Sequence, residues 1–359
     1  MKKGFCVVGF LLLTVLISVG YSCMKTRKLQ AAGEKHLKVG FLIAQTGYGA
    51  DFGDSELMAI ELLKEEFAGK LSITVEDSKS NVRDGILACR KLLDVDQVDL
   101  VYCDLTSVAN AVSSLVKAKK KIMVAAVCLR DLLSGNSLAI RNLPTAEYEG
   151  RILLRYFSSL GKTTLSLVGS NDEFGRGALE DVSGIVSEYG CRVIDKEWIP
   201  DECGQIRSLA AKLIQGAPEG VYVASLSASM GNLIRELRVQ NYKGEILSTD
   251  ATSYEYIRAN MGDSFETVTY VDFPETDYRS LLDQRALDRW GKRIQPAGLI
   301  LYDGVRFLVE MAQGPSRVWE DFCSSRIYEV SQFKGVFGES KFTNREIEYP
   351  LLLIRGNVK

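Results

Sequence analysis

The feature that most constrains the fold is a regular alternation of short β-rich runs with amphipathic stretches of helical period, which starts at Leu37. Within 55–66, apolar residues such as Leu57, Ile60 and Leu63 recur at helical spacing. Strand–helix repetition with short connections predicts parallel sheets that are covered by helices on both faces. The predicted strands are 37–44, 71–76, 98–103, 122–127, 164–169, 192–198, 220–224 and 245–248, and the predicted helices are 55–66, 81–93, 107–119, 151–160, 176–189, 205–215 and 229–240.

Two such runs meet near residues 141–144, and the length of 359 residues leaves room for about two domains. We therefore predict an α/β fold of two doubly wound parallel-sheet lobes. Sheets of this kind bind ligands beyond the carboxyl ends of their strands. The loops in which we expect a site follow Ala44, Cys103, Val127, Gly169, Ala224 and Ser248.

The N-terminus has the pattern of an export signal. Lys2 and Lys3 precede the apolar run 5–19, which is shorter than the roughly 20 residues that span a bilayer. Cys23 follows this run and resembles the lipid-attachment cysteine of bacterial lipoproteins, although Gly20 stands where leucine is commoner. We predict a signal peptide over 1–22, a polar tether over 23–36, and a periplasmic or otherwise extracytoplasmic protein anchored to the membrane through a lipid on Cys23. An uncleaved anchor and plain secretion are the alternatives.

Composition and motifs exclude several classes of function. The chain has 44 basic and 46 acidic residues, whereas a nucleic-acid-binding protein normally carries a basic excess. The chain has a single histidine, His36, at the end of the tether. A count of one excludes most zinc sites and most hydrolases with a catalytic histidine. The segment that begins at Gly47 starts like a dinucleotide-binding loop but has Phe52 at its third glycine position. We expect no catalytic residues, metal, cofactor or nucleic-acid partner, and we interpret Asp77 and Asp104 as solvated loop carboxylates.

Six cysteines lie beyond Cys6 in the signal peptide and Cys23. An even number in an oxidising compartment could form disulfides. The alternative, which we favour, is that several are buried as small apolar side chains. These six are Cys89, Cys103, Cys128, Cys191, Cys203 and Cys323.

Four segments resemble, in the correct order, the branched-chain amino-acid (Leu/Ile/Val) binding proteins of ABC transporters. These are type I periplasmic solute-binding proteins. The resemblance implies two lobes, joined by a three-strand hinge, that close on a solute. Lobe one would comprise 37–142 and 271–331, including a late helix over 299–311, and lobe two would comprise 143–270 and 332–359. The four segments are 38–53, 166–182, 220–238 and 333–356.

The resemblance also implies binding residues. Thr106 or Ser107 falls where the family has a serine that binds the ligand carboxylate, although Ser107 could simply cap a helix. Asp250 falls where an acidic residue pairs with the ligand ammonium, although it could be a solvated turn residue. Phe52 and Phe174 match aromatic positions of the cleft, and Val127 precedes one of its loops.

Two departures from the family put the solute in doubt. Leu129 replaces a threonine that holds the ligand's amino group, and Leu226 replaces a tyrosine of lobe two. An ammonium buried without partners is unfavourable by several kcal/mol, so small amides, aromatic carboxylates and short peptides stand beside amino acids as candidates.

The predicted function is delivery of a small solute to the permease of an ABC importer. The alternative is a lipoprotein of the same fold that no longer transports and acts through a protein partner. Such a protein would be a sensor or a regulator of cell-wall synthesis.

Overall fold

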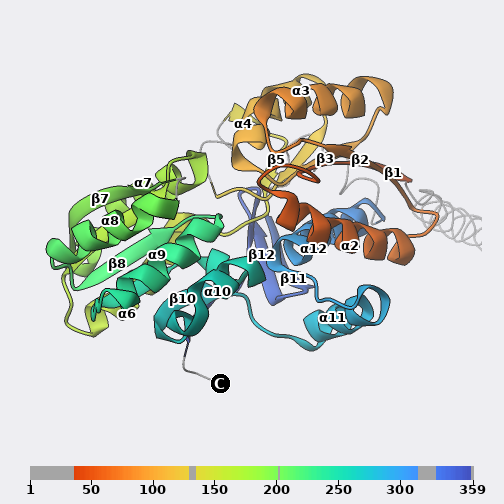
Figure 1. Cartoon of the computed structure of the whole chain (residues 1–359). Coiled ribbons are helices and arrows are strands. Elements are labelled where there is room, and N and C mark those ends of the chain that lie inside the picture. The colour runs from red at the N-terminus through yellow and green to blue at the C-terminus, as the bar shows by residue number, and fades with distance from the viewer. Residues whose placement is uncertain (1–35, 129–134, 201–202, 314–328, 357–359) are drawn as a thin grey trace, which may run out of the picture.

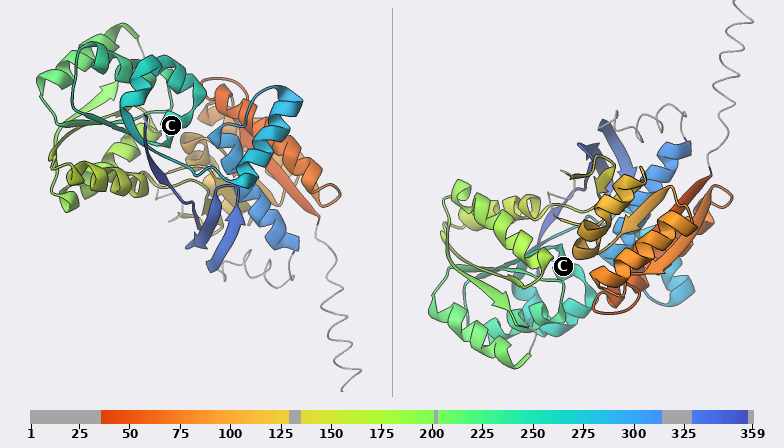
Figure 2. Two further views of the ribbon diagram at one scale, coloured as in Figure 1. Left: turned by 90° about the horizontal axis from the view of Figure 1, so that it is seen from below. Right: turned by 90° about the horizontal axis from the view of Figure 1, so that it is seen from above.

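The computed structural model describes residues 36–128, 135–200, 203–313 and 329–356. These residues form two α/β lobes that lie side by side (Figures 1 and 2). No helix within the described ranges is long and apolar enough to cross a membrane.

The first lobe is built on an eight-stranded sheet in which β1 lies between β2 and β3. Strands β1 to β5 pair in parallel, whereas β11, β12 and β13 form an antiparallel meander that joins the sheet beside β5. The strands are β1 (Leu37–Ile43), β2 (Leu71–Asp77), β3 (Leu100–Cys103), β4 (Ile122–Ala125), β5 (Ala139–Arg141), β11 (Glu329–Gly335), β12 (Gly338–Thr343) and β13 (Glu346–Glu348).

Helices cover both faces of this sheet, because β1 presents apolar side chains on both sides. Leu37, Val39 and Phe41 share a core with α2 and α12, whereas Leu42 packs with α3 and α4. The late helix therefore packs on lobe one, as the resemblance implied. The helices of this lobe are α2 (Ala50–Glu66), α3 (Val82–Arg90), α4 (Thr106–Ala118), α11 (Asp277–Trp290) and α12 (Pro296–Gln313).

The second lobe has a six-stranded sheet in the order β14-β10-β9-β8-β6-β7, and only β14 runs antiparallel to its neighbour. Helices α6 and α7 share a core with one face, and α8 and α9 pack on the other. Its strands are β6 (Thr164–Ser170), β7 (Arg192–Ile199), β8 (Gly220–Ala224), β9 (Glu245–Ser248), β10 (Val268–Asp272) and β14 (Leu352–Arg355); its helices are α6 (Ala146–Ser159), α7 (Glu173–Ile185), α8 (Cys203–Gln215), α9 (Ala228–Val239) and α10 (Glu255–Met261).

The chain passes between the two sheets three times, at 142–145, 273–274 and 349–351. The sheet pairing differs from the expected division, which placed residues 332–348 in lobe two. Strand β13 instead pairs with β5, with Glu346 opposite Arg141, so β11 to β13 belong to the first sheet. An apolar alternation within such short strands does not indicate which sheet they join, because any exposed edge can accept them.

Three helices begin at least three residues earlier than the apolar period predicted, namely α2 at Ala50, α6 at Ala146 and α7 at Glu173. For α6 the start is set by Thr145, whose hydroxyl accepts a hydrogen bond from the Tyr148 N–H at 3.1 Å. Because α2 and α7 begin early, the aromatic residues Phe52 and Phe174 lie in the first turns of helices rather than in loops.

Four cysteines, Cys89, Cys103, Cys128 and Cys191, are buried and unpaired, which confirms the favoured interpretation for these positions. Cys6, Cys23, Cys323 and the side chain of Cys203 lie outside what the structure describes. His36 is exposed, and its ring nitrogens contact the Gly69 carbonyl and the Ser72 hydroxyl.

Candidate functional site

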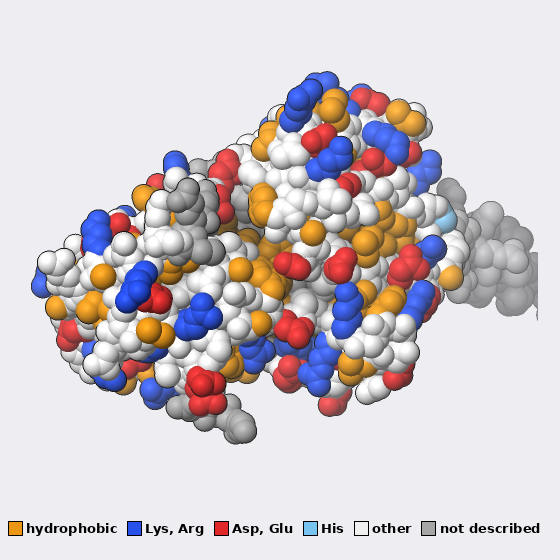
Figure 3. All heavy atoms as spheres, viewed as in Figure 1, with side chains coloured by type: hydrophobic (Ala, Val, Ile, Leu, Met, Phe, Trp, Pro, Cys, Tyr) orange, Lys and Arg blue, Asp and Glu red, His pale blue; other side chains and the backbone are white. Residues whose placement is uncertain are grey.

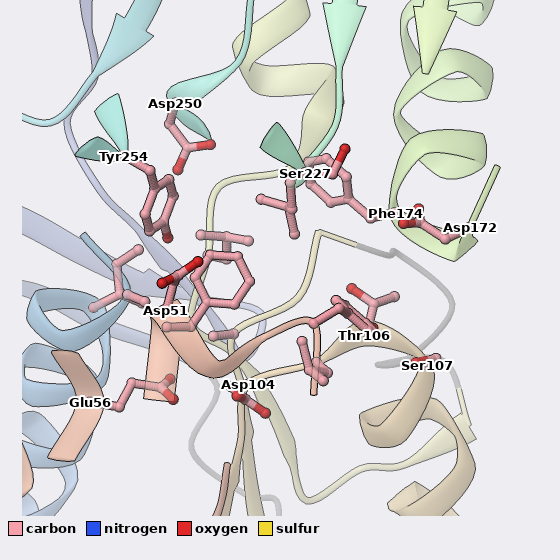
Figure 4. Close-up of a pocket in the computed structure, with 18 of the residues that line it drawn as sticks. Asp51, Glu56, Asp104, Thr106, Ser107, Asp172, Phe174, Ser227, Asp250 and Tyr254 are labelled. Atoms are coloured by element: carbon pink, nitrogen blue, oxygen red, sulfur yellow. The ribbon is translucent and has the colours of Figure 1, made fainter. Parts of the chain in front are cut away.

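A cavity of about 300 Å³ lies between the two lobes. Loops and helix starts that follow β1, β3 and β4 line it from lobe one, and those that follow β6, β8 and β9 line it from lobe two. Figure 3 shows the hollow between the lobes, and Figure 4 shows the side chains that point into it. The cavity therefore lies beyond the carboxyl ends of both sheets, where doubly wound sheets bind ligands.

Six of the eight predicted pocket residues line this cavity. Val127 does not, because it is buried in the core at 1% exposure, and its neighbour Ala126 lines the cavity instead. Successive residues of an extended segment point to opposite sides, so a shift of one position exchanges a lining residue for a core residue. Leu129 and Cys23 lie outside the described residues. The six lining residues are Phe52, Thr106, Ser107, Phe174, Leu226 and Asp250.

The two lobes touch each other around the cavity. The ring of Phe52 in lobe one meets that of Tyr254 in lobe two edge-to-face, with centroids 5.2 Å apart. The Glu255 N–H in lobe two donates a hydrogen bond to Gln295 Oε1 in lobe one at 3.1 Å. Helices α4 and α7 also approach each other to within 8 Å between Cα atoms. This arrangement can enclose a small molecule on two sides.

The start of α7 is held against the end of β6. The Asp172 carboxylate accepts hydrogen bonds from the Gly175 N–H at 2.8 Å and from the Ser170 hydroxyl at 2.9 Å. The approach is so close that a Cβ atom on Gly175 would lie 2.1 Å from the Ser170 carbonyl oxygen. Gly175 thus allows the helix start to present Phe174 to the cavity.

Helix α4 begins at Thr106, and no side chain caps its first turn. The interpretation of Ser107 as a helix cap is therefore wrong. The Ser107 side chain instead lines the cavity, as does that of Tyr48. The resemblance assigned Thr106 or Ser107 to a ligand carboxylate, and both residues line the cavity.

A buried pair of carboxyl groups lies on the lobe-one side. Glu56 is fully buried, and the Tyr102 hydroxyl donates to its Oε1 at 3.2 Å. Asp104 Oδ2 accepts a hydrogen bond from the Ala44 N–H at 2.8 Å. The carboxyl groups of Glu56 and Asp104 interact electrostatically, and neither Glu56 Oε2 nor Asp104 Oδ1 has a hydrogen-bond partner among the described residues.

Two buried carboxyl groups that interact in this way do not both ionise readily. Burial and the charge of Asp104 raise the pKa of Glu56 well above its usual range, while burial raises the pKa of Asp104 to about 6. Glu56 therefore holds a proton at neutral pH while Asp104 is mostly ionised, so the pair carries about one negative charge. The interpretation of Asp104 as a solvated loop carboxylate is wrong, because the side chain extends from β3 into a largely buried position.

A second buried carboxylate faces the cavity from lobe two. Asp250 is 6% exposed, and its backbone N–H donates to Glu149 Oε2 at 3.3 Å. Burial and the charge of Asp272 raise the pKa of Asp250 to about 7, and burial and the charge of Asp250 raise the pKa of Glu149 well above its usual range. The interpretation of Asp250 as a solvated turn residue is therefore wrong. In Figure 4, Asp250 and Asp104 reach the cavity from opposite lobes.

Several lining residues were not predicted. Glu56 had a local signal, since it follows Phe52 by four positions and thus puts a charge on the buried face of the helix. Ala297 and Ile300 had none, because α12 reaches the cavity only through the return of the chain to lobe one. Within the described ranges, no cluster of His, Cys, Asp and Glu has the arrangement of a metal site.

Comparison with known proteins agrees with this architecture. The periplasmic binding protein family matches residues 36–349. A protein of Brucella abortus (strain 2308) named Leu/Ile/Val-binding protein homolog 1 is 22% identical over 322 residues, which cover 86% of each chain.

Solved structures share the fold of the whole described chain. The leucine-binding protein LivK of Thermotoga maritima MSB8 has a TM-score of 0.77 at 15% identity, covering 90% of this chain and 97% of that one. LivJ of Streptococcus pneumoniae, in complex with isoleucine, has a TM-score of 0.76 at 14% identity, covering 90% and 98%. A solute-binding protein of an ABC transporter from Rhodopseudomonas palustris BisB5, in complex with 3,4-dihydroxy benzoic acid, has a TM-score of 0.75 at 15% identity, covering 89% and 92%.

These identities establish the fold and leave the solute open, since the structures with a named ligand hold chemically different molecules. The family match spans most of the chain, and the two lobes surround a cavity. The chain belongs to the periplasmic binding protein family and has the type I fold of that family.

Proposed function

We propose that this protein binds a small solute between its two lobes and delivers it to an ABC importer. The observation that supports this most strongly is the cavity of about 300 Å³, which takes its walls from both lobes. Because only the closed form lets both walls touch the solute, binding shifts the protein toward closure. The closed form is then the one that a permease recognises.

Export and attachment to the membrane are part of this proposal. They rest on the apolar run at the N-terminus and on Cys23, which lie outside the described residues. Incorporation of a labelled fatty acid, and its loss in Cys23→Ala, tests the attachment.

Thermal unfolding against a panel of small solutes tests the binding function. The panel contains amino acids, their amides, amines and aromatic carboxylates. A solute present at about 100 times its dissociation constant adds roughly 2.7 kcal/mol to the free energy of unfolding, so a true ligand raises the unfolding temperature by several degrees. Unchanged unfolding temperatures across the panel would contradict the proposed function.

A further inference from the structure

Both lobes line the cavity with acidic side chains. Lobe one contributes Asp51, Glu56 and Asp104, and lobe two contributes Asp172, Glu173 and Asp250. No Lys, Arg or His side chain lines the cavity in the part of the chain that the structure describes. A carboxylate that entered this space would be desolvated next to like charges, whereas a cation would gain partners on both sides.

The start of α4, where the resemblance places the ligand carboxylate, already lies next to a carboxylate of the protein, that of Asp104. The Asp104 carboxylate lies at this helix start and accepts backbone N–H groups, including that of Ala44. A carboxylate bound at this helix start would therefore lie next to the Asp104 carboxylate, whose like charge opposes its binding.

The acidic groups are also positioned to contact a ligand, because the protein itself gives them few hydrogen-bond donors. Glu56 is completely buried, and its Oε2 receives no hydrogen-bond donor within the described chain. Asp250 faces the cavity from the other lobe, with Asp272 and Glu149 as further acidic groups behind it. Apolar side chains of Phe52, Phe174 and Leu226 lie between these two acidic ends.

From this juxtaposition we propose that the solute is a small organic cation, with an ammonium or guanidinium group, an apolar body and no carboxylate. The inference rests on the proposed function, and it separates this chain from relatives that hold isoleucine or an aromatic acid. The apolar body fills the centre of the cavity while the cationic group pairs with Asp104 or Asp250.

Three matched probes isolate the charge of the solute. Leucine carries both groups, 3-methylbutylamine is leucine without its carboxylate, and 4-methylpentanoate is leucine without its ammonium. In calorimetric titrations at pH 8, we expect 3-methylbutylamine to bind at least about tenfold more tightly than leucine, and 4-methylpentanoate to give no binding heat. Tighter binding of leucine or of 4-methylpentanoate would overturn the inference.

A variant adds a test on the protein side. Asp104→Asn should weaken binding of 3-methylbutylamine at least about tenfold, whereas Asp94→Asn, which removes an exposed carboxylate of the same lobe, should leave it unchanged. Circular dichroism and the unfolding temperature show that each variant is folded. Equal affinities of the two variants would contradict a role of the cavity charge.

Failure of this inference and failure of the proposed function are distinguishable in the same panel. If the solute that binds most tightly carries a carboxylate, the inference is wrong and the proposed function stands. If no solute of any charge binds, both are wrong.

Discussion

Replacing Asp250 by Asn is expected to weaken binding of a cationic solute at least about 30-fold and to raise the stability of the solute-free protein at pH 8. The first effect follows because the variant lacks one of the two buried charges that face the cavity, which corresponds to about 2 kcal/mol. The second follows because burial and the charge of Asp272 make the ionised form of Asp250 unfavourable in the folded protein. Titration calorimetry and thermal unfolding measure the two effects separately.

The sign of the pH dependence follows from the raised pKa. The carboxyl of Asp250 has a pKa of about 7 when folded and about 4 when unfolded. Its contribution to stability is therefore fully present below about pH 4 and is lost as the pH rises toward 7. Asn does not titrate, so Asp250→Asn should be more stable than the parent at pH 8, with a smaller difference at pH 5.

The exposed Asp263 of the same lobe provides the control, since Asp263→Asn should change neither affinity nor stability. A variant Asp250→Asn that is less stable than the parent at pH 8 would contradict the unfavourable burial of this charge.

Gly175→Ala is expected to lower the free energy of unfolding by at least about 3 kcal/mol, because its Cβ would lie 2.1 Å from the Ser170 carbonyl oxygen and 2.5 Å from the Ser170 nitrogen. Both atoms belong to the backbone, so relief requires α7 to move away from β6. Such a shift also moves Phe174 and Asp172 out of place and should weaken solute binding. Thermal and denaturant unfolding measure the loss of stability, which corresponds to roughly 6–12 °C.

Gly184, in the same helix, is a matched control. It is exposed, and a Cβ on it would meet nothing within 4 Å. Gly184→Ala should leave stability unchanged or raise it by up to about 1 kcal/mol through helix propensity. A similar loss of stability in both variants would show that the close approach at Gly175 does not cause the destabilisation.

Much of the fold could be predicted from local patterns. The apolar run of β1, which is buried on both faces, and the period of 3.6 in α2 follow directly from which faces are buried, so both elements were found, although α2 begins five residues earlier than predicted. The membership of β13 in the first sheet could not be found in this way, because its three residues carry too little pattern to select a partner strand. Sheet membership at such an edge is decided by the path of the whole chain.

The cavity was predicted in part, because its position follows from the topology of the two sheets. Phe52, Phe174 and Asp250 lie in the segments that follow β1, β6 and β9, which the topology alone brings together. The state of Asp104 could not be predicted, because the sequence gives no indication that Glu56 lies beside it or that both are buried. The protonation state of a buried carboxyl group depends on neighbours that are distant in the sequence.

The central claim is that both lobes hold one solute in the cavity between them. Hydrogen exchange detected by mass spectrometry tests it most directly, with the solute from the panel that gives the largest thermal shift. The account predicts slower exchange on binding in 46–56 and 104–107 of lobe one together with 172–174, 226–228 and 250–256 of lobe two. Slower exchange confined to one lobe, or to segments away from these, would contradict it.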